Sequence, residues 1–146
     1  MVLIRQSELL PQMYGNVMIP DAVAAELTAT GSPNDIRAWM SSSPSWLKVI
    51  SISAEAVASV SESLDLGERA AIALAVRERA DLLLMDDADG RREALRRRIR
   101  VTGLIGVLLA AAEKKLIDVP DVLRRLAATN FYIDESLIER EFGRWL

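Results

Sequence analysis

The stretch Leu82-Leu83-Leu84-Met85-Asp86-Asp87 decides how the rest of the chain is interpreted. An apolar run that ends in two carboxylates is typical of a short buried strand, which delivers its acids to the carboxyl edge of a sheet. Open α/β sheets bind their ligands at that edge. Adjacent carboxylates repel each other unless a cation lies between them, and a hard divalent metal ion commonly does so. The stretch therefore predicts an α/β fold with an acidic site at the edge of its sheet.

The residues around this strand repeat the same alternation of strand and helix. Short strands are expected at residues 17–19, 46–52, 80–85 and 100–102. Helices are expected at residues 2–13, 21–28, 34–42, 54–63, 65–76, 90–99, 104–116, 120–128 and 135–146. Ser53 is in position to cap the helix at 54–63. This order predicts a helix-rich α/β fold with a short parallel sheet that helices flank on both faces. No strand precedes the first expected helix, so the sheet is one central strand short. At 146 residues the chain is expected to form a single domain, residues 1–146.

The composition removes several kinds of chemistry. The chain contains neither Cys nor His, which excludes a Ser-His-Asp triad, a Cys-His nucleophile and a zinc site built on thiolates or imidazoles. Catalysis would have to use carboxylates, hydroxyls, Lys or Arg. The net charge of -3 is not that of a globally basic nucleic-acid binder. The absence of Cys fits a cytoplasmic location, and the first residues lack the pattern of a signal peptide.

Two further acids are candidates for the same site, and each also has a simpler structural interpretation. Glu26 lies on a helix flank beside the buried positions Val23 and Leu27, where a carboxylate is usually solvated. Glu68 lies in the first turn of a helix, in Asp65-Leu66-Gly67-Glu68, where an acid often only caps the helix. Asp65 is in position to cap this helix, with Glu68 three residues on as in a capping box. Asp86 and Asp87 are open to the same alternative, because Asp-Asp-Ala-Asp-Gly is turn chemistry and Asp89 is able to cap the next helix.

Arginines follow the acidic pair closely, with six of them between residues 91 and 100. Such a run is usually a solvated helix face. Beside an acidic metal site, Arg91 and Arg92 would attract the phosphates of a nucleic acid. A DNA-binding regulator that uses the helix expected at residues 90–99 is a further interpretation of these arginines. No glycine-rich phosphate loop is present, and we expect Gly103 and Gly106 to allow close packing of a helix on a strand.

Four segments, taken in order, resemble the PIN-domain superfamily over essentially the whole chain: residues 14–27, 64–75, 83–92 and 101–109. They include Asp65-Leu66-Gly67-Glu68, Gly90-Arg91-Arg92 and Thr102-Gly103-Leu104-Ile105-Gly106-Val107-Leu108. The last two match the G-R-R and T-G-x-x-G-x-L signatures of one PIN-like branch. The resemblance implies a metal-dependent ribonuclease, and many such proteins are toxins of bacterial toxin–antitoxin pairs.

The resemblance also implies roles for individual residues. Glu26, Glu68 and either Asp86 or Asp87 match the acids that hold Mg²⁺ or Mn²⁺ in that superfamily, so these four residues are the expected catalytic and metal-binding set. Arg91 and Arg92 are the expected substrate-binding residues. The implied partners are RNA and a cognate antitoxin protein, with no membrane association.

One departure from the family pattern affects these expectations. PIN domains begin with a strand that ends in an Asp, and this chain starts at the helix that follows. A missing central strand would expose the ladder groups of two neighbours, and a homo-oligomer with an exchanged element is one way to fill the gap. A catalytically inactive PIN-like module that binds an antitoxin or another protein is therefore the alternative to the ribonuclease.

Overall fold

The computed structural model describes residues 1–146, and its first half is built around one pair of parallel strands. Helix α1 (Leu9–Tyr14) leads to strand β1 (Val17–Pro20), followed by helices α2 (Asp21–Thr28) and α3 (Asn34–Ser41) and strand β2 (Leu47–Ile50). β1 and β2 pair in parallel from Val17–Leu47 to Pro20–Ile50. Pro20 ends the strand in an extended conformation, and Asp21 in the first turn favours the start of α2.

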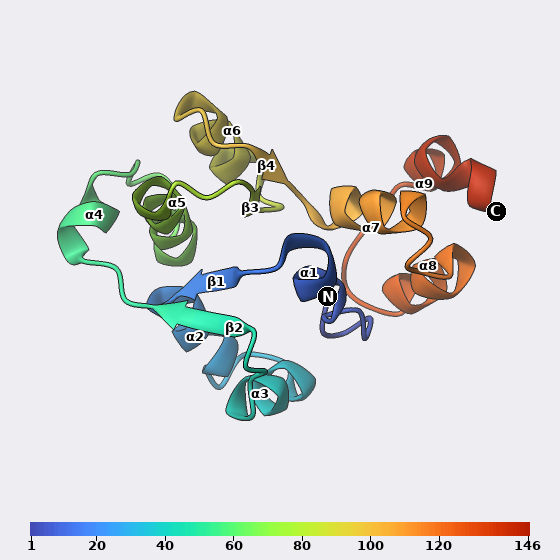
Figure 1. Cartoon of the computed structure of the whole chain (residues 1–146), viewed down its shortest axis with the longest axis horizontal. Coiled ribbons are helices and arrows are strands. Elements are labelled where there is room, and N and C mark those ends of the chain that lie inside the picture. Colours follow the sequence, from blue (N-terminus) through green and yellow to red (C-terminus); the bar gives the residue numbers. More distant parts are fainter.

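The middle of the chain contains the second pair of parallel strands. Helices α4 (Ala54–Ala58) and α5 (Leu66–Glu78) precede strand β3 (Leu83–Leu84), and helix α6 (Ala88–Arg96) connects it to strand β4 (Val101–Thr102). Both Ser53 and Asp65 cap the helix that follows them, by accepting a backbone N–H three residues further on. The apolar side of α5 is largely buried. The helix contacts β1 of the first strand pair and β3 of the second (Figure 1).

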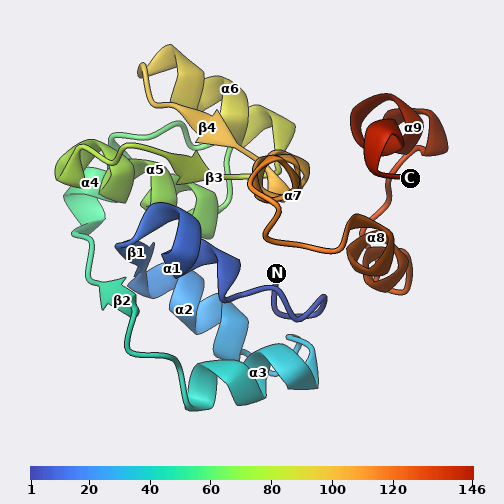
Figure 2. The same cartoon turned by 45° about the vertical axis from the view of Figure 1, so that its right-hand side comes forward.

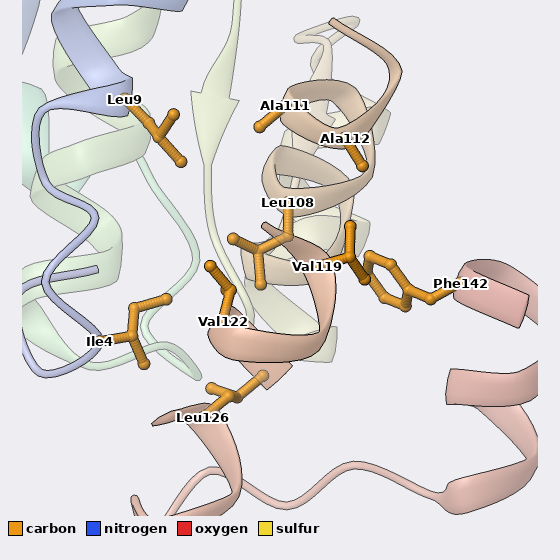
Figure 3. Packing of buried hydrophobic residues seen from close by; sticks show 9 residues of the cluster. All are labelled: Ile4, Leu9, Leu108, Ala111, Ala112, Val119, Val122, Leu126 and Phe142. Carbon is orange, nitrogen blue, oxygen red and sulfur yellow. The ribbon is translucent and has the colours of Figure 1, made fainter. Parts of the chain in front are cut away.

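Three helices and a short 3₁₀ turn close the chain: α7 (Leu104–Glu113), α8 (Val119–Ala127), α9 (Glu135–Phe142) and η1 (Gly143–Trp145). Figure 2 shows α8 and α9 beyond α7, on the side away from α4 and α5. They are held by a buried cluster in which Ile4 and Leu9 from the N-terminal segment meet Leu108 of α7 and Val122 of α8, while Phe142 of α9 packs from the opposite side (Figure 3). A second cluster, around Ile72 and Ala94, joins α5 to α6.

The structure has the expected class, a helix-rich α/β fold with short parallel sheets. Its four strands form two separate two-stranded sheets, β1-β2 and β3-β4, instead of one continuous sheet. A cleft of about 1100 Å³ lies between them and is lined mostly by apolar residues of β1, β3, α2, α5 and the N-terminal segment. We call it the inter-sheet cleft.

Several expected elements are shorter than the sequence pattern suggests. The helix expected at residues 2–13 begins only at Leu9, because the chain makes a tight turn with Arg5 at a φ of 56°. The helix expected at 54–63 ends at Ala58, where the Ser59 hydroxyl donates to the carbonyl of Ala56 and competes with the helical hydrogen bonds. The strand expected at 80–85 pairs over only two residues, because β4 offers only two partners.

Candidate functional site at three helix N-termini

Glu26 lies against the first turn of α5. A Cβ atom placed on Gly67 would be 2.5 Å from Oε1 and 2.6 Å from Oε2 of Glu26, so the carboxylate occupies the space that any larger residue at position 67 would need. Glu26 is exposed, as expected for a residue on a helix flank, and its carboxylate nevertheless reaches a second helix. The Glu26 carboxylate therefore lies at the first turn of α5, the turn that also contains Glu68.

Glu68 lies in a crowded acidic environment at the same helix start. Burial raises the pKa of the Glu68 carboxyl, and the negative charges of Asp65 and Asp87 raise it further. Asp65 also caps α5, since its Oδ1 accepts the backbone N–H of Glu68 at 2.9 Å. The capping expected from the sequence is confirmed, and the repulsion from Asp87 shows that two separate acidic motifs lie near each other in space.

Asp86 reaches the N-terminus of a helix that is distant in the sequence. Its Oδ1 accepts the backbone N–H of Leu104, the first residue of α7, at 2.9 Å and across 18 residues of chain. The same oxygen would be 2.5 Å from a Cβ on Gly103. Gly103 thus makes room for the Asp86 carboxylate. The expected helix–strand packing role fits Gly106 instead, where a Cβ would collide with the Thr102 side chain.

Asp87 caps α6, with its Oδ2 accepting the backbone N–H of Gly90 at 2.8 Å. The sequence pattern offered Asp89 for this cap, but Asp89 lies inside the first turn of the helix and pairs with Arg92. The sequence did not decide whether Asp86 or Asp87 is the metal ligand. In the structure each of them accepts a backbone N–H at the start of a different helix. Each carboxylate uses one oxygen in its capping bond, and the second oxygen is free to take another partner.

The four predicted acids therefore gather around the N-termini of α5, α6 and α7, where the helix dipoles stabilise negative charge. They do not converge on one point, because no three acidic side chains come close enough to hold a metal ion together. The donor chemistry nevertheless suits Mg²⁺ or Mn²⁺, since Mg²⁺ prefers oxygen ligands and commonly uses one or two carboxylates with waters and substrate phosphate.

The predicted arginines lie in different surroundings. The guanidinium of Arg91 lies beside Asp86, with Nη1 3.5 Å from the position of a Cβ on Gly103. Arg92 points to Asp89 at 2.8 Å, and both side chains are exposed. Arg97 has a structural role: it pairs with the buried Glu93 at 2.9 Å and donates to the carbonyl of Ser59. Of the whole run, Arg91 is the arginine placed at the acids.

The sequence pattern missed two contributions to this site. One is the pair Gly67 and Gly103, whose missing side chains admit the Glu26 and Asp86 carboxylates; a glycine at the start of a helix was the available signal. The other is the amino group of Met1. Burial lowers its pKa and the nearby Asp86 opposes that shift, so the N-terminal segment reaches the same region.

The fold and these acids define an α/β protein with short parallel sheets and a carboxylate-rich site at helix N-termini. The chain belongs to the PIN-domain family, since a family model described as a PIN domain matches residues 1–145. No curated protein and no solved structure matches the chain in such comparisons. None of the helices combines the length and the apolar character that a membrane crossing requires.

Proposed function

We propose that this chain is a metal-dependent endoribonuclease that hydrolyses RNA phosphodiester bonds. The observation that carries the proposal is the placement of Glu26, Glu68, Asp86 and Asp87 at three neighbouring helix starts, with glycines that leave space for two of the carboxylates. These acids come from three separate parts of the chain, and only Asp86 and Asp87 have a capping role there. Burial raises the pKa of Glu68, and the charges of Asp65 and Asp87 raise it further; a cation among the acids reduces this repulsion.

In this proposal Asp86 and Asp87 hold Mg²⁺ or Mn²⁺ through the carboxylate oxygens that their capping bonds leave free, and Glu68 and Glu26 complete the acidic surroundings. A cation held there would supply a water of lowered pKa and would polarise the phosphate. Arg91 binds the RNA phosphate beside Asp86, and its charge lowers the repulsion between that phosphate and the acids. Arg92, which Asp89 holds at the surface, contributes at most to attracting the backbone.

We further propose that the chain acts as the toxin of a toxin–antitoxin pair in the cytoplasm and binds a cognate antitoxin protein. Its membership of the PIN-domain family supports this role. A second function is favoured by one observation, the lack of three converging acids. A PIN-like module that binds an antitoxin or another protein without cutting RNA would have no need for a complete metal site.

Cleavage of structured and single-stranded RNAs with Mg²⁺ or Mn²⁺ tests the choice. The unaltered chain is compared with Glu68→Gln, which removes one acid of the site, and with Glu62→Gln, which removes an exposed acid outside it. Metal-dependent cleavage that is lost only in Glu68→Gln is the result expected for the ribonuclease. Equal cleavage by both variants, or none by the unaltered chain, would contradict it, and binding of a protein partner without metal affinity would favour the inactive module.

A further inference from the structure

The outer side of α6 concentrates positive charge on a chain that is acidic as a whole. Residues 89–98 contain five arginines and two acids, a net charge of +3, whereas the whole chain carries -3. Figures 1 and 2 both show α6 at the rim of the molecule. The arginines and the large apolar residue exposed on this side are Arg91, Arg92, Leu95, Arg96 and Arg98.

The arginines at the C-terminal end of α6 exceed what the fold needs there. The buried carboxylate of Glu93 pairs with Arg96 at 3.3 Å and with Arg97 at 2.9 Å, and Arg97 also donates to the carbonyl of Ser59. Arg98 takes part in none of the ion pairs. The C-terminal end of a helix carries about half an elementary negative charge, so three arginines around one carboxylate leave an excess of positive charge. This excess, at Arg96 and Arg98, is available to an anion.

An exposed apolar side chain lies beside these two cations. Leu95 is 61% exposed, it precedes Arg96, and its carbonyl accepts the backbone N–H of Arg98 at 2.9 Å. The bases of a duplex are stacked inside it, so a duplex would offer Leu95 only ribose and phosphate. An unpaired base is free to pack on a side chain. Two cations beside an apolar side chain therefore suit a single strand better than a duplex.

The same helix leads from this end to the acids. Asp87 caps the first turn of α6, and the guanidinium of Arg91 lies beside Asp86. From Arg91 to Arg98 the chain advances seven residues, which is about 10 Å at 1.5 Å per residue. A stacked nucleic-acid strand advances about 3.4 Å per phosphate, so about three nucleotides span this length. One RNA strand is thus long enough to reach both arginines.

We propose that Leu95, Arg96 and Arg98 form a second RNA subsite, which binds a phosphate and an unpaired base of single-stranded RNA about three nucleotides from the acids. Arg96 and Arg98 bind the phosphate, and Leu95 contacts the base. The inference rests on the proposed function, because it extends the path of the same substrate beyond Arg91. Continuity with the acids through α6 favours RNA over an acidic protein segment as the occupant.

The experiment measures binding of fluorescein-labelled nonauridylate to the full chain by anisotropy, over a series of KCl concentrations. Divalent cations are left out, so that no cleavage occurs and only monovalent salt competes with the protein. The variants are the double substitution Arg96→Gln with Arg98→Gln, and Leu95→Ser. Arg79→Gln is the matched control. Arg79 is exposed and follows a helix with a φ of 49°, as Arg98 does with a φ of 61°, but it lies at the end of α5 opposite to Glu68.

Each phosphate contact on a single strand contributes about 0.7 to the slope of log K against log salt concentration. The double variant should therefore reduce this slope by about 1.4 and weaken binding about 25-fold at about 0.1 M salt. Leu95→Ser should weaken binding severalfold without a change in slope, and Arg79→Gln should change neither quantity.

The proposal is wrong if the double variant keeps the slope, if Arg79→Gln reduces it too, or if Leu95→Ser binds as tightly as the unaltered chain. It is also wrong if an RNA duplex binds as tightly as nonauridylate. Competition by octaglutamate as strong as that by unlabelled nonauridylate would overturn it as well, and would assign the surface to an acidic protein segment. None of these readouts measures cleavage or metal binding, so a failure of the subsite is distinguishable from a failure of the proposed function.

Discussion

Replacing Asp86 separates its structural role from its proposed chemical role. The Asp86 Oδ1 accepts the N–H of Leu104, and α7 has no other side-chain cap, because its N-cap residue is Gly103. Loss of such a cap costs about 1 kcal/mol, within a range of roughly 0.5–2 kcal/mol, whereas Asn caps about as well as Asp. Asp86→Ala should therefore lower the free energy of unfolding by about 1 kcal/mol, and Asp86→Asn should leave it nearly unchanged.

Urea denaturation and thermal unfolding measure this difference. For a chain of this size, a loss of about 1 kcal/mol corresponds to a drop in Tm of about 2–4 °C. Both variants should lose metal-dependent RNA cleavage, because Asn keeps the hydrogen-bond acceptor but not the charge. If Asp86→Asn destabilises the chain as much as Asp86→Ala, the capping account is wrong. If Asp86→Asn keeps full cleavage, the carboxylate has no chemical role.

Three further predictions concern the site and its support. Gly67→Ala should displace the Glu26 carboxylate and reduce cleavage. It should keep or raise the stability of α5, since Ala costs about 1 kcal/mol less than Gly in a helix. Circular dichroism and cleavage assays would show both effects, and unaltered cleavage would argue against a role for Glu26. Glu93→Gln should lower the free energy of unfolding by about 1.5–3 kcal/mol, because Glu93 is buried and bonded to Arg97; a loss below the error of urea denaturation would refute this. Hydrogen bonds from Ser136 lower the pKa of Asp134, so the cap of α9 contributes stability above the ordinary Asp pKa and loses it as pH falls through the lowered value. Amide exchange in α9 should therefore accelerate as the pH falls through that lowered pKa. In Asp134→Asn, exchange in α9 should no longer depend on this titration.

Local sequence patterns predicted the elements whose start and end signals lie within a few residues. α2 has the expected bounds because Pro20 and Asp21 define its start, and Ser53 caps α4 as its position suggested. The strand predicted at residues 80–85 pairs only at Leu83–Leu84, because its length depends on its partner β4, which follows α6 in the chain. Pattern alone could not show how many strands would pair with it.

The candidate site divides in the same way. The acids were identifiable as residues, and the caps of Asp65 and Ser53 were visible from spacing. The bond from Leu104 to Asp86 spans 18 residues, and the contact of Glu26 with Gly67 joins two helices that are separated by a strand and two further helices. Such contacts arise only after tertiary packing, so no local pattern predicts them. The structural role of Arg97 was hidden for the same reason, because its partner on the neighbouring segment is the carbonyl of Ser59.

The central claim is that the acids around three helix N-termini bind one metal ion, with Asp86 and Asp87 as its ligands and Glu68 and Glu26 as its acidic surroundings. Titration of the full chain with Mn²⁺, followed by the electron paramagnetic resonance signal of the free ion, tests it most directly. The account predicts saturable binding that is weakened at least about tenfold in Glu68→Gln and in Asp86→Asn, but not in Glu62→Gln, because each of the first two removes one carboxylate from the shared site. Equal Mn²⁺ affinity in all four proteins, or no saturable binding by the unaltered chain, would contradict it.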